Sequence, residues 1–406
     1  MHQERKISEG IYWIGGNDRR LAKFENCYPI PDGISYNSYL IMDEKNVLLD
    51  TVDKSIEKIF FENLEYLLGE QKLDYVIVNH MEPDHAATLG ELLKRYPDVT
   101  VVGTAKTFDL IRQFFDVDLQ GHMMKVTEGG TLSTGRHELT FIMAAMVHWP
   151  EVMVTYDKTD GILFTADAFG TFGAIGGNIF ADEVDFEKYW LDEARRYYAN
   201  IVGKYGTQVQ TLLNKAAGLD LQILCPLHGP IFRINKKILW YIEKYSRWAT
   251  YRPEDAEVVI AYGNVYGDTE NAVEILANML AERNVKHIKM FDLGVTDKSY
   301  VLSEAFRASH LVLASTTYNN GLFPDMETLL LDLKAHSVQG RTVALIENGS
   351  WAPTAAKHMR EILSSMKNIT VLEPTLTIKS SLKEEQLETL SAMADAISKS
   401  LDEQVI

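Results

Sequence analysis

The sequence has little cysteine, a deficit of positive charge and no long uninterrupted apolar run. Its two cysteines, Cys27 and Cys225, exclude a disulfide framework and fit a reducing, cytoplasmic setting. A net charge of −17 argues against a nucleic-acid-binding protein and against binding to anionic membranes. The N-terminus lacks the apolar core of a signal peptide, and Asp167 and several glycines interrupt the apolar stretch 162–180. We therefore expect neither secretion nor membrane insertion.

The length of 406 residues predicts two or three domains. In the first 250 residues, strand-like runs alternate with helical periodicity, which favours two packed sheets covered by helices. The predicted strands cover residues 35–42, 46–51, 74–79, 99–104, 138–147, 152–157 and 161–167, and the predicted helices lie near 55–69, 87–96, 105–115, 184–203 and 206–217.

The alternation becomes regular after Pro253, which disfavours helix for the preceding Arg252. Five nearly continuous apolar strands, each followed by a helix, indicate a buried parallel sheet. We therefore predict one domain at 1–252 and a second at 253–406. The second has strands at 258–262, 286–292, 310–315, 341–347 and 369–373, with helices at 269–283, near 299–308, and at 324–336, 353–366 and 383–401.

Four ionisable side chains follow the predicted strand 74–79 within six residues, in the segment NHMEPDH: His80, Glu82, Asp84 and His85. Neutral imidazole and carboxylate are both metal ligands. Packed together without a cation, these groups would suffer like-charge repulsion and loss of hydration. The alternative is a solvated acidic helix N-terminus that Asp84 caps.

Three more groups of the same kind end apolar strands. His148 lies in FIMAAMVHWP, Asp167 in GILFTADAFG and His228 in LQILCPLHGP. A single His or Asp at a strand end is more often structural than a ligand. Three of them, each with Gly, Pro or Ala within two residues, favour one shared metal site.

These segments resemble the metallo-β-lactamase superfamily, which usually carries His-x-His-x-Asp-His, then a distant His, a bridging Asp and a final His. The resemblance implies an αββα sandwich for the first domain. The departure is Glu82, where the hydrolases have a second His. Exchanging imidazole for carboxylate makes the site harder and favours iron or manganese over zinc.

Three loops of the second domain have the composition of a nucleotide site, and ligands of open parallel sheets bind at the carboxyl ends of the strands. In the first loop, backbone N–H groups, the Thr269 hydroxyl and the following helix N-terminus suit a phosphate. In the later loops, Tyr318 and Trp351 could flank a flat ring, although Trp351 could equally cover the sheet. The predicted contacts are Asn264, Val265, Tyr266, Gly267, Asp268, Thr269, Thr316, Thr317, Tyr318, Asn319, Asn320, Gly321, Asn348, Gly349, Ser350 and Trp351.

This half resembles flavodoxin, which implies a doubly wound five-stranded parallel sheet that binds FMN. Tyr266, Gly267 and Thr269 match the family's phosphate loop, and Asn264 replaces its first hydroxyl residue. An Asn amide can still donate to a phosphate. The Gly-x-Gly-x-x-Gly motif is absent, and no Walker lysine follows Gly267.

The two halves together resemble the flavodiiron proteins, which implies FMN and two iron ions. By that resemblance His80, Glu82 and His148 hold one iron, Asp84, His85 and His228 hold the other, and Asp167 bridges them. In some family members the residue that matches His85 makes no direct bond to the metal. Phe24 and Tyr197 align with family positions near the distal pocket. The alternative for Phe24 is ordinary packing, and for Tyr197, in the predicted helix 184–203, a core aromatic is the default.

The resemblance further implies reduction of dioxygen to water, of nitric oxide to nitrous oxide, or both, as detoxification in anaerobes. It implies a head-to-tail homodimer or a dimer of such dimers. No Cys-x-x-Cys pair follows the second domain, so we expect a separate electron donor, either rubredoxin or a reduced deazaflavin coenzyme. Nitric oxide as main substrate, a zinc hydrolase with an appended flavodoxin-like domain, and a non-catalytic electron carrier are the alternatives.

Overall fold

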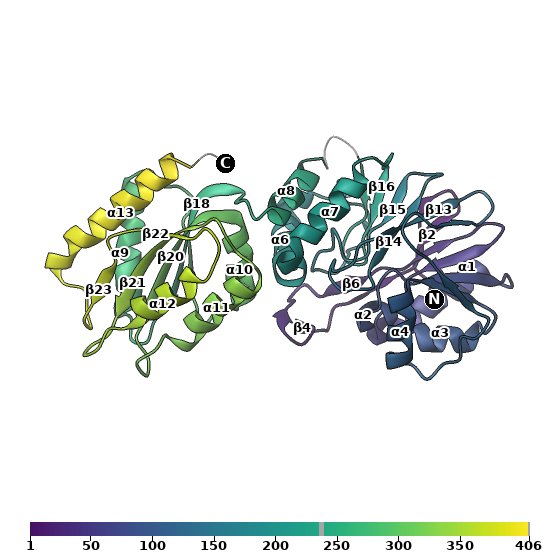
Figure 1. Cartoon of the computed structure of the whole chain (residues 1–406), viewed down its shortest axis with the longest axis horizontal. Helices are drawn as coiled ribbons and strands as arrows, with labels where there is room; N and C mark the ends of the chain where they lie inside the picture. Colours follow the sequence, from purple (N-terminus) through teal and green to yellow (C-terminus); the bar gives the residue numbers. More distant parts are fainter. Residues whose placement is uncertain (235–238, 405–406) are drawn as a thin grey trace. The chain divides into compact units, whose positions relative to one another are not determined.

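The computed structural model describes residues 1–234 and 239–404 and divides the chain into two compact units (Figure 1). The first unit comprises Met1–Tyr198 and Tyr205–Ser246, and the second comprises Ala199–Lys204 and Arg247–Ile406. The predicted domain boundary at residue 253 is not tested by this division and stays a prediction.

The first unit is built on two sheets that pack face to face. The seven-stranded sheet has the order β1-β2-β7-β8-β9-β10-β11, and the six-stranded sheet has the order β12 to β17. Apolar side chains of both sheets share one core, among them Tyr39, Ile77, Phe141 and Phe164. The strands are β1 Arg5–Ser8, β2 Ile11–Trp13, β7 Tyr39–Ile41, β8 Asn46–Leu49, β9 Leu73–Ile77, β10 Thr100–Gly103, β11 Met123–Lys125, β12 Thr131–Ser133, β13 Glu138–Met143, β14 Met153–Asp157, β15 Ile162–Phe164, β16 Ile223–Cys225 and β17 Phe232–Arg233.

Helices lie outside both sheets, which completes the predicted αββα sandwich (Figure 1). Helices α1 (Glu57–Leu68), α3 (Leu89–Arg95) and α4 (Ala105–Phe114) lie beside the first sheet, and α6 (Leu191–Tyr197) and α7 (Gly206–Ala216) beside the second. The predicted helix 184–203 is broken. It consists of α5 (Phe186–Tyr189), α6 and a wider π-helical turn, Tyr198–Val202, and Trp190 leaves helical geometry between the first two.

Short paired strands, helix α2 and most of helix α8 complete the first unit. β3 (Gly16–Asp18) pairs with β6 (Ile34–Tyr36), and β4 (Lys23–Phe24) pairs with β5 (Tyr28–Pro29). Helix α2 (Pro83–Ala86) follows the end of β9, and α8 (Leu239–Ala249) leads towards the second unit.

The second unit is a parallel sheet of the order β19-β18-β20-β21-β22, with β23 also paired to β21. This is the doubly wound order of the flavodoxin type, as predicted. The predicted fifth strand 369–373 is shorter in the structure, where it is β22, and a further strand that was not predicted, β23, follows it. Pro374 lies between them and has no N–H to donate to a ladder. The strands are β18 Asp255–Gly263, β19 Lys289–Asp292, β20 Ala308–Thr316, β21 Thr342–Asn348, β22 Thr370–Val371 and β23 Leu376–Ile378.

Helices α9 (Asp268–Glu282) and α13 (Leu387–Asp402) pack on one face of this sheet, where Val258 and Ile260 of β18 meet Leu276 and Leu390. Helices α10 (Lys298–Arg307), α11 (Pro324–Ala335) and α12 (Ala355–Ser364) bury apolar residues on the other face. Among the described residues, no helix is both long and apolar enough to span a bilayer.

Candidate metal centre and flavin pocket

The seven predicted ligand residues all follow strand ends at one edge of the sandwich. His80, Glu82, Asp84 and His85 lie between β9 and the end of α2, and His148 lies in the turn 144–152 between β13 and β14. Asp167 follows β15 and His228 follows β16. Because β15 and β16 are parallel neighbours, these last two residues lie at the same edge. The topology thus gathers residues that are up to 148 positions apart in the sequence.

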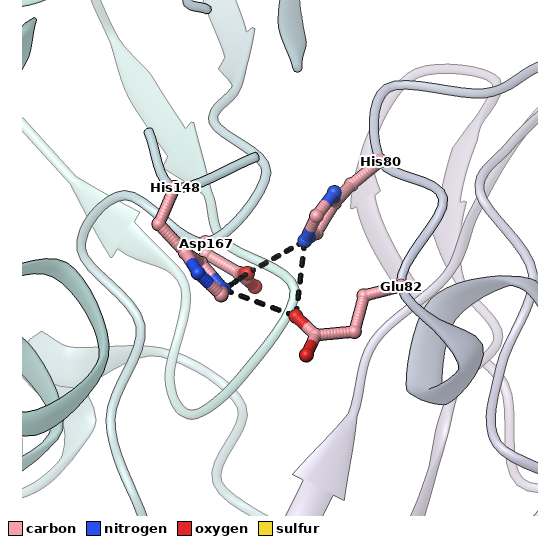
Figure 2. A group of neighbouring side chains, drawn as sticks. All are labelled: His80, Glu82, His148 and Asp167. Carbon is pink, nitrogen blue, oxygen red and sulfur yellow. Dashed lines mark hydrogen bonds and ion pairs between the residues drawn. The ribbon is translucent and has the colours of Figure 1, made fainter. Parts of the chain in front are cut away.

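A first group is formed by His80, Glu82, His148 and Asp167, whose ligand atoms lie within 4.8 Å of one another. Glu82 Oε2 is 3.2 Å from His80 Nε2 and 3.0 Å from His148 Nε2. Asp167 Oδ2 is 3.2 Å and 3.3 Å from the same two nitrogens. Figure 2 shows the four side chains converging on one point, His80 and Glu82 from one segment and His148 and Asp167 from two others.

A second group is formed by Asp84, His85 and His228. Asp84 Oδ2 is 3.3 Å from His85 Nε2 and 3.1 Å from His228 Nε2. The other oxygen of Asp167, Oδ1, lies 3.1 Å from His85 Nε2 and 3.8 Å from His228 Nε2. Asp167 therefore directs one oxygen to each group, which is the arrangement that a bridging carboxylate requires. His85 points into the group.

The two groups have the chemistry of a cation site. His80, His85, Asp167 and His228 are buried, yet Asp167 Oδ2, His228 Nε2 and both carboxylate oxygens of Asp84 make no hydrogen bond among the described residues. Buried polar atoms are rarely left in this state unless a ligand satisfies them. Four imidazoles and three carboxylates fit two divalent or trivalent ions, and the mixed oxygen and nitrogen donors suit iron.

The pKa values of the proposed ligands show that the carboxylates and imidazoles of the site stabilise each other's charged forms. Burial alone would lower the pKa of His80, but Asp167, Glu151 and Glu82 raise it well above its ordinary value. The pKa of His148 rises to about 9 against the same penalty, because Asp167 and Glu82 are adjacent. The pKa of Asp167 falls well below its ordinary value despite burial, since His85 and His80 lie beside it. Metal binding would replace these protons.

Three buried residues that the sequence analysis did not identify support the ligands. Glu151 Oε1 accepts hydrogen bonds from His80 Nδ1 at 2.8 Å and from Met81 N at 2.9 Å. His228 Nδ1 donates to the Ser35 carbonyl oxygen at 2.7 Å. Asp50 accepts from the backbone N–H of His80 at 3.1 Å. Such contacts fix the tautomer and direction of a ligand.

Glu151 lies between the predicted strands 138–147 and 152–157, and Asp50 lies near the end of the predicted strand 46–51. That position was the available signal for both. For Ser35 the sequence offers none, because the partner is its backbone oxygen.

Aromatic rings cover the His228 side of the site. The rings of Phe24 and Tyr197 lie 5.4 Å and 5.3 Å from the His228 ring, and Phe172 contacts both at 5.5 Å and 5.1 Å between centroids. The Tyr197 hydroxyl is buried and has no hydrogen-bond partner within the described part of the chain. Burial and the neighbouring Asp167 raise the pKa of Tyr197 well above its ordinary value, so it stays protonated. Phe172 was not predicted.

Glu25 lies next to Glu82 of the first group, in a loop where Glu25 and Asn26 both adopt left-handed backbone angles. The residue reaches solvent, while its carboxyl end meets Glu82. Burial of that end and the hydrogen bond with Glu82 raise the pKa of Glu25 to about 8. A bound cation would lower this pKa.

The second unit has a pocket of about 290 Å³ at the carboxyl ends of β18, β20 and β21. Fourteen of the predicted flavin contacts line it, all except Gly267 and Gly321, and Ala352 and Ser380 line it in addition. Gly267 forms the turn before α9 with φ +98°, a backbone angle that side chains disfavour. The helix N-terminus and the hydroxyls of Thr269 and Thr316, 3.0 Å apart, form a cradle for a phosphate.

Two polar residues organise the pocket loops. Asn348 Nδ2 donates to the Ser380 carbonyl oxygen at 2.7 Å and to Thr269 Oγ1 at 3.4 Å, so it joins three loops. Asn264 is engaged within its own loop. Its Oδ1 accepts from Gly267 N at 3.1 Å, and its Nδ2 donates to Glu270 Oε2 at 3.3 Å instead of pointing a free amide at the pocket.

Comparison with known proteins identifies the chain's relatives. The profile of the ODP family beta lactamase matches residues 34–229. The nitric oxide reductase of Moorella thermoacetica is 32% identical over 383 residues, 93% of this chain and 94% of that protein. Rubredoxin oxygen:oxidoreductase from Desulfovibrio gigas superposes with a TM-score of 0.92 at 27% identity and 99% coverage of both chains. A variant of the flavo di-iron protein from Thermotoga maritima gives 0.88 at 26% identity and 98% coverage of both. The chain belongs to the flavodiiron protein family.

Proposed function

We propose that the chain reduces dioxygen, nitric oxide or both at two irons that receive electrons from FMN. The observation that carries this proposal is Asp167, which presents one carboxylate oxygen to each of two clustered ligand groups. The similar proteins named above are called a nitric oxide reductase and an oxygen oxidoreductase, and these names support both substrates.

The proposed ligands follow the two groups. His80, Glu82 and His148 would hold one iron, Asp84, His85 and His228 the other, and Asp167 both. When bound, two ferrous ions supply two electrons together to a small diatomic molecule, and FMN replenishes them. Residues 1–252 would form the metal domain and residues 253–406 the flavin domain.

The surrounding side chains would control water and protons. Phe24 and Phe172 keep the His228 side of the site apolar. The Tyr197 hydroxyl is protonated and has no acceptor among the described residues, so it can donate a hydrogen bond to a substrate oxygen. Glu25 reaches from solvent to Glu82, which suits it to carry protons on its carboxyl group. Both reductions consume protons together with electrons.

The partners follow from the same proposal. Electrons would come from a separate donor, either rubredoxin or a reduced deazaflavin coenzyme. Two chains would assemble head to tail, with FMN of one beside the irons of the other, alone or as a dimer of dimers. We place the protein in the cytoplasm, because only two cysteines occur and no described helix could span a membrane.

The deciding experiment is the iron, zinc and FMN content of protein prepared without oxygen, followed by parallel assays of dioxygen and nitric oxide consumption. About two irons and one FMN per chain with consumption of either gas would support the proposal. Two zinc ions that iron-rich growth does not displace would overturn it and favour a hydrolase. Sedimentation of the same sample would test the dimer.

A further inference from the structure

Glu151 is a buried carboxyl group directly behind one of the proposed iron ligands. It lies in the turn 144–152, which also contributes His148 to the metal site. Its Oε1 accepts from His80 Nδ1 at 2.8 Å and from Met81 N at 2.9 Å, and both side chains of the ion pair are completely buried. The other oxygen, Oε2, is buried and makes no hydrogen bond among the described residues.

Among the described residues, no carboxylate is hydrogen-bonded to Nδ1 of a histidine in the second group. His228 Nδ1 donates to a neutral backbone carbonyl, that of Ser35, at 2.7 Å. His85 Nδ1 is buried and makes no hydrogen bond within the described residues. The two proposed iron sites share Asp167 and have similar ligands, but within the described residues a carboxylate is hydrogen-bonded to an imidazole from behind in only one of them. The buried Asp50 lies near His85, but it accepts from the N–H groups of Asn79 and His80 instead.

A carboxylate behind a metal-bound imidazole fixes its tautomer and makes it a stronger donor. In a buried site its charge also stabilises the more positive state of the metal. We propose that Glu151 is a positioning residue: it directs His80 Nε2 into the site and makes the iron held by His80, Glu82 and His148 the more tightly bound, with the more stable ferric state. This inference rests on the proposed diiron function.

A merely structural role for Glu151 can be distinguished from an effect on the iron, because the same unit contains a second buried pair of a histidine and a carboxylate. His137 Nδ1 lies 2.9 Å from Asp157 Oδ2, and both side chains are buried. Arg136 donates to the other ring nitrogen, His137 Nε2, at 3.0 Å. The variant Asp157→Asn therefore removes a buried carboxylate behind an imidazole that is not among the proposed ligands.

The experiment uses the full chain as Glu151→Gln, Glu151→Ala and Asp157→Asn. Each protein is equilibrated anaerobically with ferrous iron and a chelator, and iron per chain, the Mössbauer spectrum and the midpoint potentials are measured. We expect Glu151→Gln to weaken one iron by about 10- to 100-fold and to raise its potential, because the amide keeps an acceptor but loses the charge. Asp157→Asn should keep both irons and the wild-type spectrum at a similar loss of thermal stability.

Unchanged iron affinity, spectrum and potential in Glu151→Gln would overturn the inference. So would loss of iron in Glu151→Ala alone, because the hydrogen bond and not the charge would then matter. Equal weakening of both irons would also contradict the asymmetry. Failure of the wild-type chain to bind two irons would instead overturn the proposed function, so the two failures are distinguishable.

Discussion

The metal site and the flavin pocket are built in opposite ways. The exposed fraction is 0% for His80 and His228 and 1% for Asp167. The aromatic residues around the flavin pocket remain in water, with exposed fractions of 94% for Tyr266 and 83% for Trp351. One site is complete within the protein, whereas the other presents surfaces that a flat ligand would cover.

This difference follows from what each ligand needs. A pair of metal ions requires charged donors at fixed positions in a dry cavity, and buried partners hold two of the proposed ligands: Glu151 holds His80, and the Ser35 carbonyl holds His228. A flavin brings its own large apolar surface and must leave an edge accessible to an electron donor. The side chains that would contact the flavin ring can therefore be exposed to solvent before FMN binds, and only the residues around the phosphate need to be in place beforehand.

The largest expected effect is loss of the metal pair in Asp167→Ala. Because Asp167 faces both groups, its removal would leave two sets of ligands without their shared anion. We expect iron to fall from about two per chain to nearly none, while FMN stays bound. Metal analysis and flavin absorbance of one anaerobic preparation measure both quantities.

The control for this variant is Asp160→Ala, which breaks a partly exposed ion pair with Arg136 away from the proposed ligands. It should keep both irons. Full iron retention in Asp167→Ala would mean that this carboxylate does not bridge.

The converse prediction concerns Thr269→Ala combined with Tyr266→Ala. Thr269 Oγ1 lies in the phosphate cradle, 3.0 Å from Thr316 Oγ1. We expect FMN affinity to fall roughly 100-fold, about 3 kcal/mol, because hydrogen bonds to a charged phosphate are strong. Iron content should not change. Flavin fluorescence titration measures the affinity, and an unaltered dissociation constant would show that the phosphate binds elsewhere.

The proposed ligands could be inferred from the sequence, whereas the contacts that hold them could not. Four imidazoles and three carboxylates at strand ends carry their chemistry in their residue types, and the structure brings all seven together. Glu151 contacts a residue 71 positions away, and Ser35 contacts one 193 positions away through a backbone oxygen. Neither distance nor backbone direction is encoded in a local pattern.

The fold was similarly predictable where the periodicity was strong. The parallel strands of the second unit are apolar on both faces, so their positions and the class of the sheet could be read from the sequence. The interruptions of helices and the very short strands could not be predicted from the sequence. Trp190 divides a continuous helical pattern, and the short strands β3 to β5 carry too few residues for a period to emerge. Tertiary packing determines such features.

The two units should also differ in their response to pH. His310, in β20, is buried between Ser309 and Ser400, and burial lowers its pKa from 6.5 to about 4. Between these pH values His310 is protonated in the unfolded chain but neutral in the folded unit. The free energy of unfolding therefore decreases as the pH falls below 6.5. We expect a loss of about 2 kcal/mol from pH 7 to pH 5.

Urea unfolding of the FMN-bound chain, followed by flavin fluorescence, measures this loss. The FMN phosphate titrates in the same range, so the relevant quantity is the difference between wild type and His310→Gln. The variant should lose less stability on acidification. Identical pH profiles would contradict the assignment.

The smallest expected effect concerns the phosphate cradle, and it tests how far the flavin pocket is preformed compared with the metal site. Glu270 lies in the first turn of α9, where its Oε2 accepts from Asn264 Nδ2 behind the loop. Its negative charge opposes a bound phosphate across several ångströms of partly exposed protein. Glu270→Gln should therefore tighten FMN binding by about twofold at low salt, near 0.4 kcal/mol, and the gain should vanish at 1 M salt because the ions screen it. Glu274→Gln, one turn further along the same helix and exposed, should give a smaller gain.

Weaker binding in Glu270→Gln would show that the Asn264–Glu270 hydrogen bond shapes the loop more than the charge disturbs it, and the flavin pocket would then be preformed to the same degree as the metal site.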